Sequence, residues 1–214
     1  MINSADKFWG LARAGRWDQI RYWLWSYWAG LDFSKVTVER RALSYVWSGQ
    51  SSGSGGPVLL DVLEHLEIPP GCSIIDIGSG KGAAMITLLE SEKFEEVCGV
   101  EVSTDMVRIA ERNLNKLGLK RWRLWAGDAS YFSDELDAFN FIYMFNPFPA
   151  TVMRYFLHNL RQSLTRNSRW LDLIYANPEC DEDLVASELF DDVEEFRPLG
   201  APVPIKLYRR WNHG

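Results

Sequence analysis

From residue 58 onward, short continuous apolar runs alternate with stretches in which apolar residues recur at helical spacing. This alternation predicts strands separated by helices. Short continuous apolar runs are typical of buried strands. They occupy residues 72–77, 97–102, 122–126, 139–145 and 170–175, with two further predicted strands near 193–197 and 205–211. Helical spacing of apolar residues covers 58–66, 82–89, 104–117 and 151–164. This order predicts an α/β fold with a doubly wound, mostly parallel sheet of about seven strands, covered by helices on both faces.

The first 48 residues have a different character, because they hold six of the ten tryptophans. Between Trp17 and Trp28 the apolar residues cover more than one face of a helix, so such a helix needs cover on several sides. We expect residues 1–48 to form a helical N-terminal extension. Residues 49–57 read GQSSGSGGP and predict a flexible connection. Residues 58–214 would then form the main domain.

Composition narrows the class of protein. The chain has 214 residues and a net charge of −6, which disfavours a general electrostatic grip on nucleic acid phosphates. Its three cysteines make no C-x-x-C pair, so we expect neither a zinc site nor a disulfide framework. The most apolar early stretch, residues 22–31, has about half of the ~20 residues that a membrane span needs. We expect a soluble cytoplasmic protein.

A glycine-rich loop follows the first strand of the main domain and reads Asp76-Ile77-Gly78-Ser79-Gly80-Lys81-Gly82. Glycines allow a sharp turn and close approach of a ligand, and the helix N-terminus beyond suits an anionic group. A phosphate-binding P-loop is excluded, because glycine follows the lysine where serine or threonine is required. A dinucleotide loop is matched loosely by Gly78, Gly80 and Ala83, and an acid followed by alternating glycines is matched in full.

Polar residues also follow the next three predicted strands. Glu101 ends the second strand, where a carboxylate can accept both hydroxyls of a ribose. Asp128 follows the third strand and can accept an adenine amino group. Asn146-Pro147-Phe148 follows the fourth, where proline stiffens the loop, asparagine offers an amide and phenylalanine can form a wall. In doubly wound sheets this edge is where ligands bind.

Taken together, residues 55–211 resemble the class I S-adenosylmethionine-dependent methyltransferases, and the loop wording is similar to that of non-SET histone lysine methyltransferases and small bacterial members of unassigned substrate. The resemblance implies S-adenosylmethionine as cofactor. It implies that the loop, with Gly78, Ser79, Gly80 and Gly82, cradles the methionine part and that Asp76 helps place its amino group. The remaining implied roles are these: Glu101 binds the ribose, Val102 packs on adenine, Asp128 binds the adenine amino group beside Ala129, and Asn146 lies nearest the methyl group and the acceptor, with Phe148 next to it.

The acceptor stays open at this point. Relatives that methylate adenine or glutamine carry Pro-Pro after the acid or asparagine, whereas this chain has Pro147 followed by Phe148. A nitrogen on a protein or small molecule is the acceptor that we expect, in preference to nucleic acid. The resemblance requires no metal. A nicotinamide-dependent oxidoreductase and a non-catalytic cofactor-binding module are the alternatives, and the tryptophan-rich extension is expected to act as a lid or as a homodimer interface.

Overall fold

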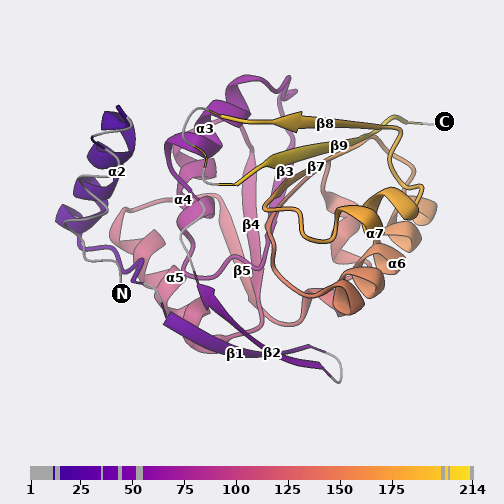
Figure 1. The fold of residues 1–214 in the computed structure, drawn as a ribbon, viewed down its shortest axis with the longest axis horizontal. Coiled ribbons are helices and arrows are strands. Elements are labelled where there is room, and N and C mark those ends of the chain that lie inside the picture. Colours follow the sequence, from indigo (N-terminus) through magenta and orange to yellow (C-terminus); the bar gives the residue numbers. More distant parts are fainter. Residues whose placement is uncertain are drawn as a thin grey trace.

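A computed structural model describes residue 12 and residues 15–34, 36–42, 45–51, 55–198, 201 and 203–212. Its centre is a seven-stranded sheet (Figure 1). The strands are β3 (Ser73–Ile77), β4 (Glu96–Glu101), β5 (Trp122–Ala126), β6 (Phe141–Phe145), β7 (Leu171–Ala176), β8 (Asp192–Phe196) and β9 (Ile205–Arg210). Their order is β5-β4-β3-β6-β7-β9-β8. The doubly wound α/β sheet expected from the sequence is therefore confirmed.

The order in which strands are added to the sheet reverses at β3, between two neighbouring parallel strands. The chain leaves β3 toward β4 and β5 on one side, then returns to β6 on the other side of β3. The pairs β3–β4, β4–β5, β3–β6 and β6–β7 are parallel, whereas β9 runs antiparallel to both β7 and β8. In such sheets the crevice beyond the carboxyl ends of the strands at the reversal point binds ligands. Here that point lies between β3 and β6.

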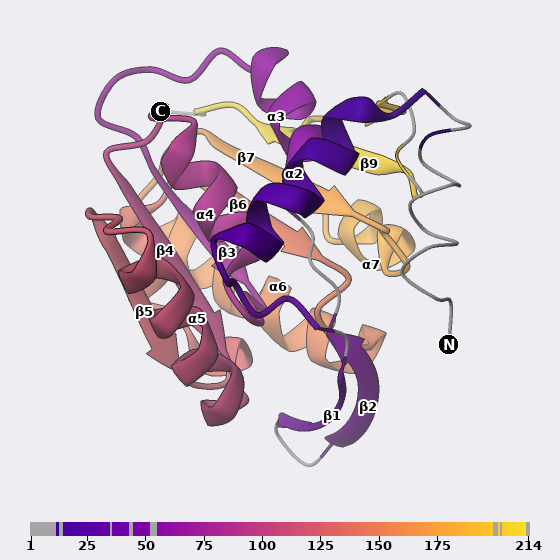
Figure 2. The same cartoon turned by 90° about the vertical axis from the view of Figure 1, so that its left-hand side faces the viewer.

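Helices cover both faces of the sheet, as Figures 1 and 2 show. They are α3 (Pro57–Glu64), α4 (Ala83–Glu90), α5 (Thr104–Lys116), α6 (Ala150–Arg166) and α7 (Asp181–Ala186). Apolar side chains of α3, α4 and α5 share one core cluster with one face of the sheet. Those of α6 and α7 share a second cluster with the other face. Because side chains alternate along a strand, Ile74 lies in the first cluster and its neighbour Ile75 in the second.

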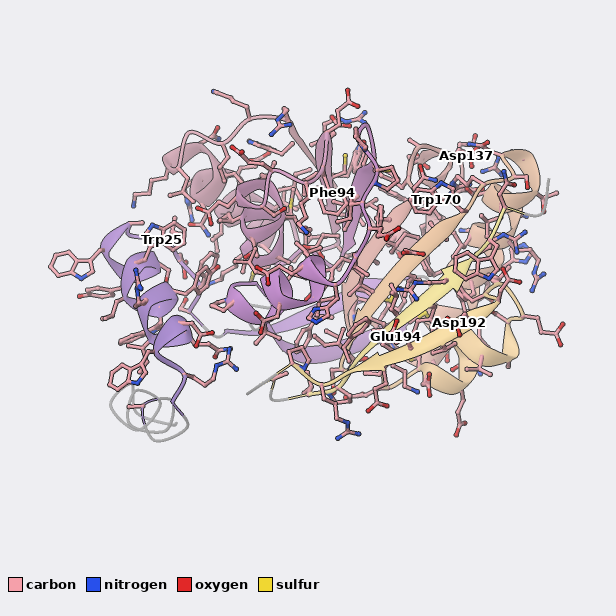
Figure 3. The ribbon with its side chains drawn as sticks, turned by 90° about the horizontal axis from the view of Figure 1, so that it is seen from above. Trp25, Phe94, Asp137, Trp170, Asp192 and Glu194 are labelled. Atoms are coloured by element: carbon pink, nitrogen blue, oxygen red, sulfur yellow. The ribbon has the colours of Figure 1, made fainter. Side chains whose placement is uncertain are left out.

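Aromatic rings close the first cluster at the edge where the parallel strands begin. Phe141 lies edge-on between Phe94 and Trp170, with ring centroids 5.3 Å from each. Phe94 and Trp170 are labelled in Figure 3. Such edge-to-face pairs contribute about 0.5–1.5 kcal/mol each beyond area burial. The strand beginnings therefore serve stability and leave the opposite edge to the ligand.

The N-terminal segment is only partly helical. Helix α2 (Trp17–Trp28) contacts α3, and Trp25 packs against the first core cluster. Figure 2 shows α2 as the outermost layer beside α3 and α4, and Figure 3 labels Trp25 on it. Residues 36–51 form an antiparallel hairpin of β1 (Val36–Ala42) and β2 (Tyr45–Ser51), with Val36 opposite Ser51.

The hairpin corrects the expectation of an all-helical extension over residues 1–48. The tryptophan content suggested helices, but Val36-Thr37-Val38 is rich in β-branched residues, which favour strands. The expected flexible connection over residues 49–57 also differs. Residues 49–51 belong to β2, and the Gly56 N–H donates a 2.7 Å hydrogen bond to Thr87 Oγ1 of α4. Residues 1–11 and 52–54 lie outside the described residues.

The structure bears on the membrane question in one respect. Among the residues that it describes, none of the helices combines the length and the apolar character needed to cross a bilayer.

Gly55 offers a test of how closely the N-terminal segment is packed on α4. A Cβ at this position would stand 2.2 Å from the carbonyl oxygen of Ala83, which is backbone and cannot move aside. Gly55→Ala is expected to lower the free energy of unfolding by about 1–3 kcal/mol, as overpacking does. Urea denaturation measures the change. Gly127→Ala, whose new Cβ would have an ordinary 3.6 Å contact with Phe132, is the control and should change stability by less than about 0.5 kcal/mol.

Candidate active site

The glycine-rich loop folds back over the end of β4. The N–H groups of Gly78 and Ser79 both donate to the carbonyl oxygen of Val100, at 2.9 and 3.0 Å. Gly78 and Gly82 have φ values of +78° and +80°, in the left-handed region that favours glycine. α4 then begins at Ala83 without a side-chain cap on its first N–H groups. The first N–H groups of α4 are thus left available as donors at the edge where the parallel strands end.

Glu101, at the end of β4, connects the glycine-rich loop to the segments that follow β4 and β5. Its carboxylate is 2% exposed and accepts hydrogen bonds from the Gly80 N–H at 3.1 Å and the Ser103 N–H at 2.9 Å. Its carbonyl oxygen accepts from the Gly127 N–H at 3.0 Å. The ribose-binding residue expected from the sequence therefore lies against the glycine loop and also braces it.

Asp76 is the second buried acid of the site. Burial raises the pKa of its carboxyl to about 8, and repulsion from the nearby Glu101 carboxylate adds to the shift. A carboxyl group in this state is largely neutral at pH 7, and an approaching cation would ionise it. The pair of acids therefore suits a ligand that carries positive charge.

The loop after β6 lies directly against the glycine loop. A Cβ built on Gly78 would stand only 2.7 Å from Cβ of Pro147. The neighbouring Asn146 has a φ of +39°, and its Oδ1 accepts a 3.3 Å hydrogen bond from the hydroxyl of Tyr175 in β7. Burial raises the pKa of Tyr175, so this hydroxyl remains protonated and able to donate. Asn146 is thus held beside the point between β3 and β6 where the strand order reverses.

The loop after β5 holds the residues expected near adenine. Asp128 begins the short helix η1 (Ala129–Tyr131), and its Oδ1 accepts from the N–H and the hydroxyl of Ser130, at 2.9 and 2.6 Å. Ala129 is buried, and Val102 is half-buried directly after Glu101. Asp128 therefore caps a turn, and its role toward adenine remains a prediction.

Phe148 is more deeply buried than we expected for a wall of the acceptor pocket, and its role there remains a prediction. Its side chain is 8% exposed, belongs to the core cluster beneath α6, and has its ring 5.9 Å from that of Phe156. A wall of an open acceptor pocket would need a more accessible ring. The physical reason is the turn into α6: Pro149 is the N-cap residue of this helix, so the chain turns the preceding ring inward under the helix.

The structure also brings residues to the site that the sequence did not single out. The ammonium of Lys81 in the glycine loop contacts Asp32 and Ser34 from the N-terminal segment. Tyr175 contacts Asn146 from β7. Strand position signals Tyr175, because it lies one residue before the end of β7 at the ligand edge. Asp32, in contrast, lies outside the main domain and carries no motif.

The residues present fit S-adenosylmethionine, whose sulfonium and amino groups are cations. Two buried acids, Asp76 and Glu101, lie beside the loop. Ser79 Oγ is buried and has no hydrogen-bond partner among the described residues, so it is a polar atom that a ligand would satisfy. Of the described His, Cys, Asp and Glu side chains, no three are grouped so as to hold a metal ion.

Comparison with known proteins also indicates a methyltransferase. Residues 74–167 match the family model described as "Methyltransferase domain". Over 85 residues the chain is 29% identical to the ribosomal RNA small subunit methyltransferase H of Crocosphaera subtropica, which covers 39% of this chain. The matched stretch spans only 27% of that relative.

Two solved structures share the fold. A SAM-dependent methyltransferase from Aquifex aeolicus has a TM-score of 0.55 at 20% identity, covering 70% of this chain and 87% of its own. An RNA methyltransferase from Salinibacter ruber, solved with S-adenosyl-L-homocysteine, has a TM-score of 0.54 at 16% identity, covering 74% and 93%. Residues 74–167 therefore match a methyltransferase domain, and the chain has the fold of S-adenosylmethionine-dependent methyltransferases. In this methyltransferase, the contacts described above hold together the ends of β5, β4, β3 and β6.

The raised pKa of Asp76 predicts how the stability of the methyltransferase depends on pH. Between the ordinary carboxyl pKa and about 8, the native state holds a proton that the unfolded chain has lost. The contribution of Asp76 to stability therefore falls as pH rises through this window, by up to about 1.4 kcal/mol per pH unit. Denaturant unfolding at pH 6, 7 and 8 should show a steeper decline for the wild type than for Asp76→Asn, which carries no titrating group there. Equal slopes would contradict the raised pKa.

Proposed function

We propose that this protein transfers a methyl group from S-adenosylmethionine to a nitrogen acceptor. The observation that carries the proposal is the meeting of the glycine loop, the buried Glu101 and Asn146 at the point where the sheet reverses direction. The cofactor supplies an electrophilic methyl group on a sulfonium. The chain spans about a quarter of the curated relative that it matches, so the activity is inferred from the site itself.

Each residue of the site has a part in this proposal. The glycine loop cradles the methionine part of the cofactor. Its carboxylate accepts from the uncapped N–H groups at the start of α4 and from Ser79 Oγ, and ionised Asp76 holds its amino group. Glu101 accepts from the ribose hydroxyls, Val102 packs on adenine, and Asp128 accepts from the adenine amino group beside Ala129. Asn146 orients the acceptor. Alignment of well-oriented groups can lower the barrier by roughly 7–11 kcal/mol.

A protein or small-molecule acceptor is favoured over RNA by the net charge of −6. RNA methyltransferases among the proteins of similar fold support the opposite choice. Incubation with S-adenosylmethionine labelled on the methyl group, in an extract from cells that lack the protein, separates these classes. Label that survives ribonuclease and is lost to protease indicates a protein acceptor, and the reverse indicates RNA. Label in the low-mass fraction indicates a small molecule.

The N-terminal segment contributes to the acceptor side in this proposal. Ser34 contacts Lys81 of the glycine loop, so the hairpin that begins at Val36 starts beside the site. Trp17, Tyr27 and Trp28 of α2 are exposed, and a homodimer through them is the competing use of this segment. A lid predicts a monomer at micromolar concentration by ultracentrifugation, whereas an interface predicts a dimer.

A nicotinamide-dependent oxidoreductase is the second candidate, because Glu101 also suits the ribose of NAD. The strand order of the sheet disfavours an oxidoreductase. Dinucleotide-binding folds have the order 3-2-1-4-5-6, whereas here an antiparallel strand, β9, is inserted between β7 and β8.

Glu101→Ala tests the cofactor assignment. Loss of two charge-assisted hydrogen bonds, each worth about 1.5–3 kcal/mol, should weaken binding of S-adenosylhomocysteine by at least tenfold in titration calorimetry. Glu96→Ala is the matched control, because Glu96 begins the same strand and pairs with Arg123 away from the site. The wild type should bind S-adenosylhomocysteine and not NAD. Unchanged affinity in folded Glu101→Ala would remove this residue from the cofactor site.

Asn146→Ala tests the acceptor assignment. The variant should bind S-adenosylhomocysteine within about threefold of the wild type, because only the acceptor side is altered, and should lose at least about 100-fold in methylation of the labelled acceptor. Tyr175→Phe, which removes the hydrogen bond to Asn146 and keeps the ring, should lose less. A collapse of cofactor affinity with methylation retained would place Asn146 on the cofactor side instead.

A further inference from the structure

Lys81 is a buried cation in the middle of the glycine loop. Its side chain is 4% exposed, and its three hydrogen bonds all go to two residues of the N-terminal segment. The ammonium lies 2.7 Å from Asp32 Oδ1, 3.0 Å from the Ser34 carbonyl oxygen and 2.8 Å from Ser34 Oγ. A buried ammonium without partners would cost several kcal/mol. The loop therefore depends on Asp32 and Ser34 to complete it.

Further contacts fasten the same segment to α5. The side chain of Asn113 accepts from the Asp32 N–H at 3.1 Å and donates to the Lys81 carbonyl oxygen at 3.0 Å. The ammonium of Lys116 donates to the Gly30 carbonyl oxygen at 2.8 Å. Asn113 thus contacts the N-terminal segment and the glycine loop at once. We call residues 30–34 the strap.

The segment that follows the hairpin is attached to α4. Gly56 donates to Thr87 Oγ1 in α4, and Gly55 packs on the Ala83 carbonyl group. Lys81 precedes α4 by two residues, so both ends of the segment 34–55 are held around the first turns of α4. In Figures 1 and 2 the β1–β2 hairpin lies at the end of the molecule opposite α3, the end that holds the glycine loop.

We propose that Lys81 is a positioning residue that couples cofactor binding to the placement of the strap and hairpin. The inference rests on the proposed function, in that S-adenosylmethionine occupies the glycine loop. The cofactor fixes the loop backbone from one side and the strap fixes it through the Lys81 side chain from the other. Each therefore favours the same loop conformation, and this coupling is reciprocal. Because the hairpin continues from the strap, cofactor loading places the hairpin beside the acceptor site.

Hydrogen bonding and burial have opposite effects on the pKa of Asp32, the partner of Lys81. Burial opposes ionisation of Asp32, yet the hydrogen bonds from Lys81 and Ser34 hold its pKa below the usual value. The carboxylate is therefore charged at neutral pH and meets the ammonium as an ion pair. Substitution of either partner leaves the other without its opposite charge, which makes the two substitutions non-additive.

The experiment measures S-adenosylhomocysteine affinity by calorimetry and backbone hydrogen exchange by mass spectrometry. Lys81→Met keeps the length of the side chain and removes its charge. We expect affinity to fall about tenfold, within the 5- to 150-fold range typical of coupled sites. Asp32→Asn should lose less, and Lys81→Met combined with Asp32→Asn should bind no worse than Lys81→Met alone. Lys120→Met, at an exposed lysine, is the control and should bind as the wild type does.

Hydrogen exchange separates coupling from a merely structural role. In the wild type, S-adenosylhomocysteine should slow exchange in residues 78–82 and also in 30–34 and 36–51. In Lys81→Met at saturating ligand, protection of 78–82 should persist while the added protection of 30–34 and 36–51 disappears. Equal protection of the strap in the wild type and in Lys81→Met overturns the inference. Unchanged S-adenosylhomocysteine affinity in both Lys81→Met and Asp32→Asn also overturns it.

Failure of this inference is distinguishable from failure of the proposed function. A wild type that binds no S-adenosylhomocysteine contradicts the cofactor itself. Normal binding with no transmission to the strap contradicts only the coupling. If Lys81→Met does not fold, Asp32→Asn carries the test alone, because Asp32 is 45% exposed and its substitution leaves the core intact.

Discussion

The hydrogen bond from the Gly80 N–H to the buried carboxylate of Glu101 is the contact on which the rest of the site depends. It fixes the glycine loop against β4, and the Gly127 N–H reaches the Glu101 carbonyl oxygen from the β5 loop. Gly78 in the same loop leaves room for Pro147 from the β6 loop. Glu101 therefore connects the loops that follow β3, β4 and β5, and the close approach of Gly78 to Pro147 adds the loop that follows β6.

The same arrangement has an electrostatic cost. Burial raises the pKa of Asp76, and repulsion from the Glu101 carboxylate adds to the shift, so that Asp76 holds a proton that the unfolded chain would release. A cationic ligand relieves this repulsion, so part of its binding free energy comes from removing a strain that the protein already carries. The ion pair between the buried ammonium of Lys81 and the partly exposed carboxylate of Asp32 has the opposite effect, because its charges are satisfied within the chain and it fastens the N-terminal segment.

Much of this architecture was predictable from local pattern. The continuous apolar runs located the strands of the main sheet to within about two residues, and the motif residues after β3, β4 and β6 meet where the order of strands predicted. Pairwise contacts were not predictable in this way. Asp32 and Lys81 are separated by 49 positions and neither belongs to a repeating pattern. The hairpin was missed because its tryptophan outweighed its β-branched residues. The burial of the Phe148 ring was not predictable because it depends on the turn into α6.

The position of β9 also bears on how the chain is made. β9 is the last strand in the sequence, yet it lies between β7 and β8 and supplies the pairing of both. During synthesis from the N-terminal end, β8 therefore has no partner until residues up to Arg210 have emerged from the ribosome. Until then β7 forms an open edge, rich in apolar residues, next to a nearly complete cofactor half. A nascent chain of this kind is most exposed to misassociation after β8 has emerged and before β9 has, and this is the interval in which a chaperone would matter most.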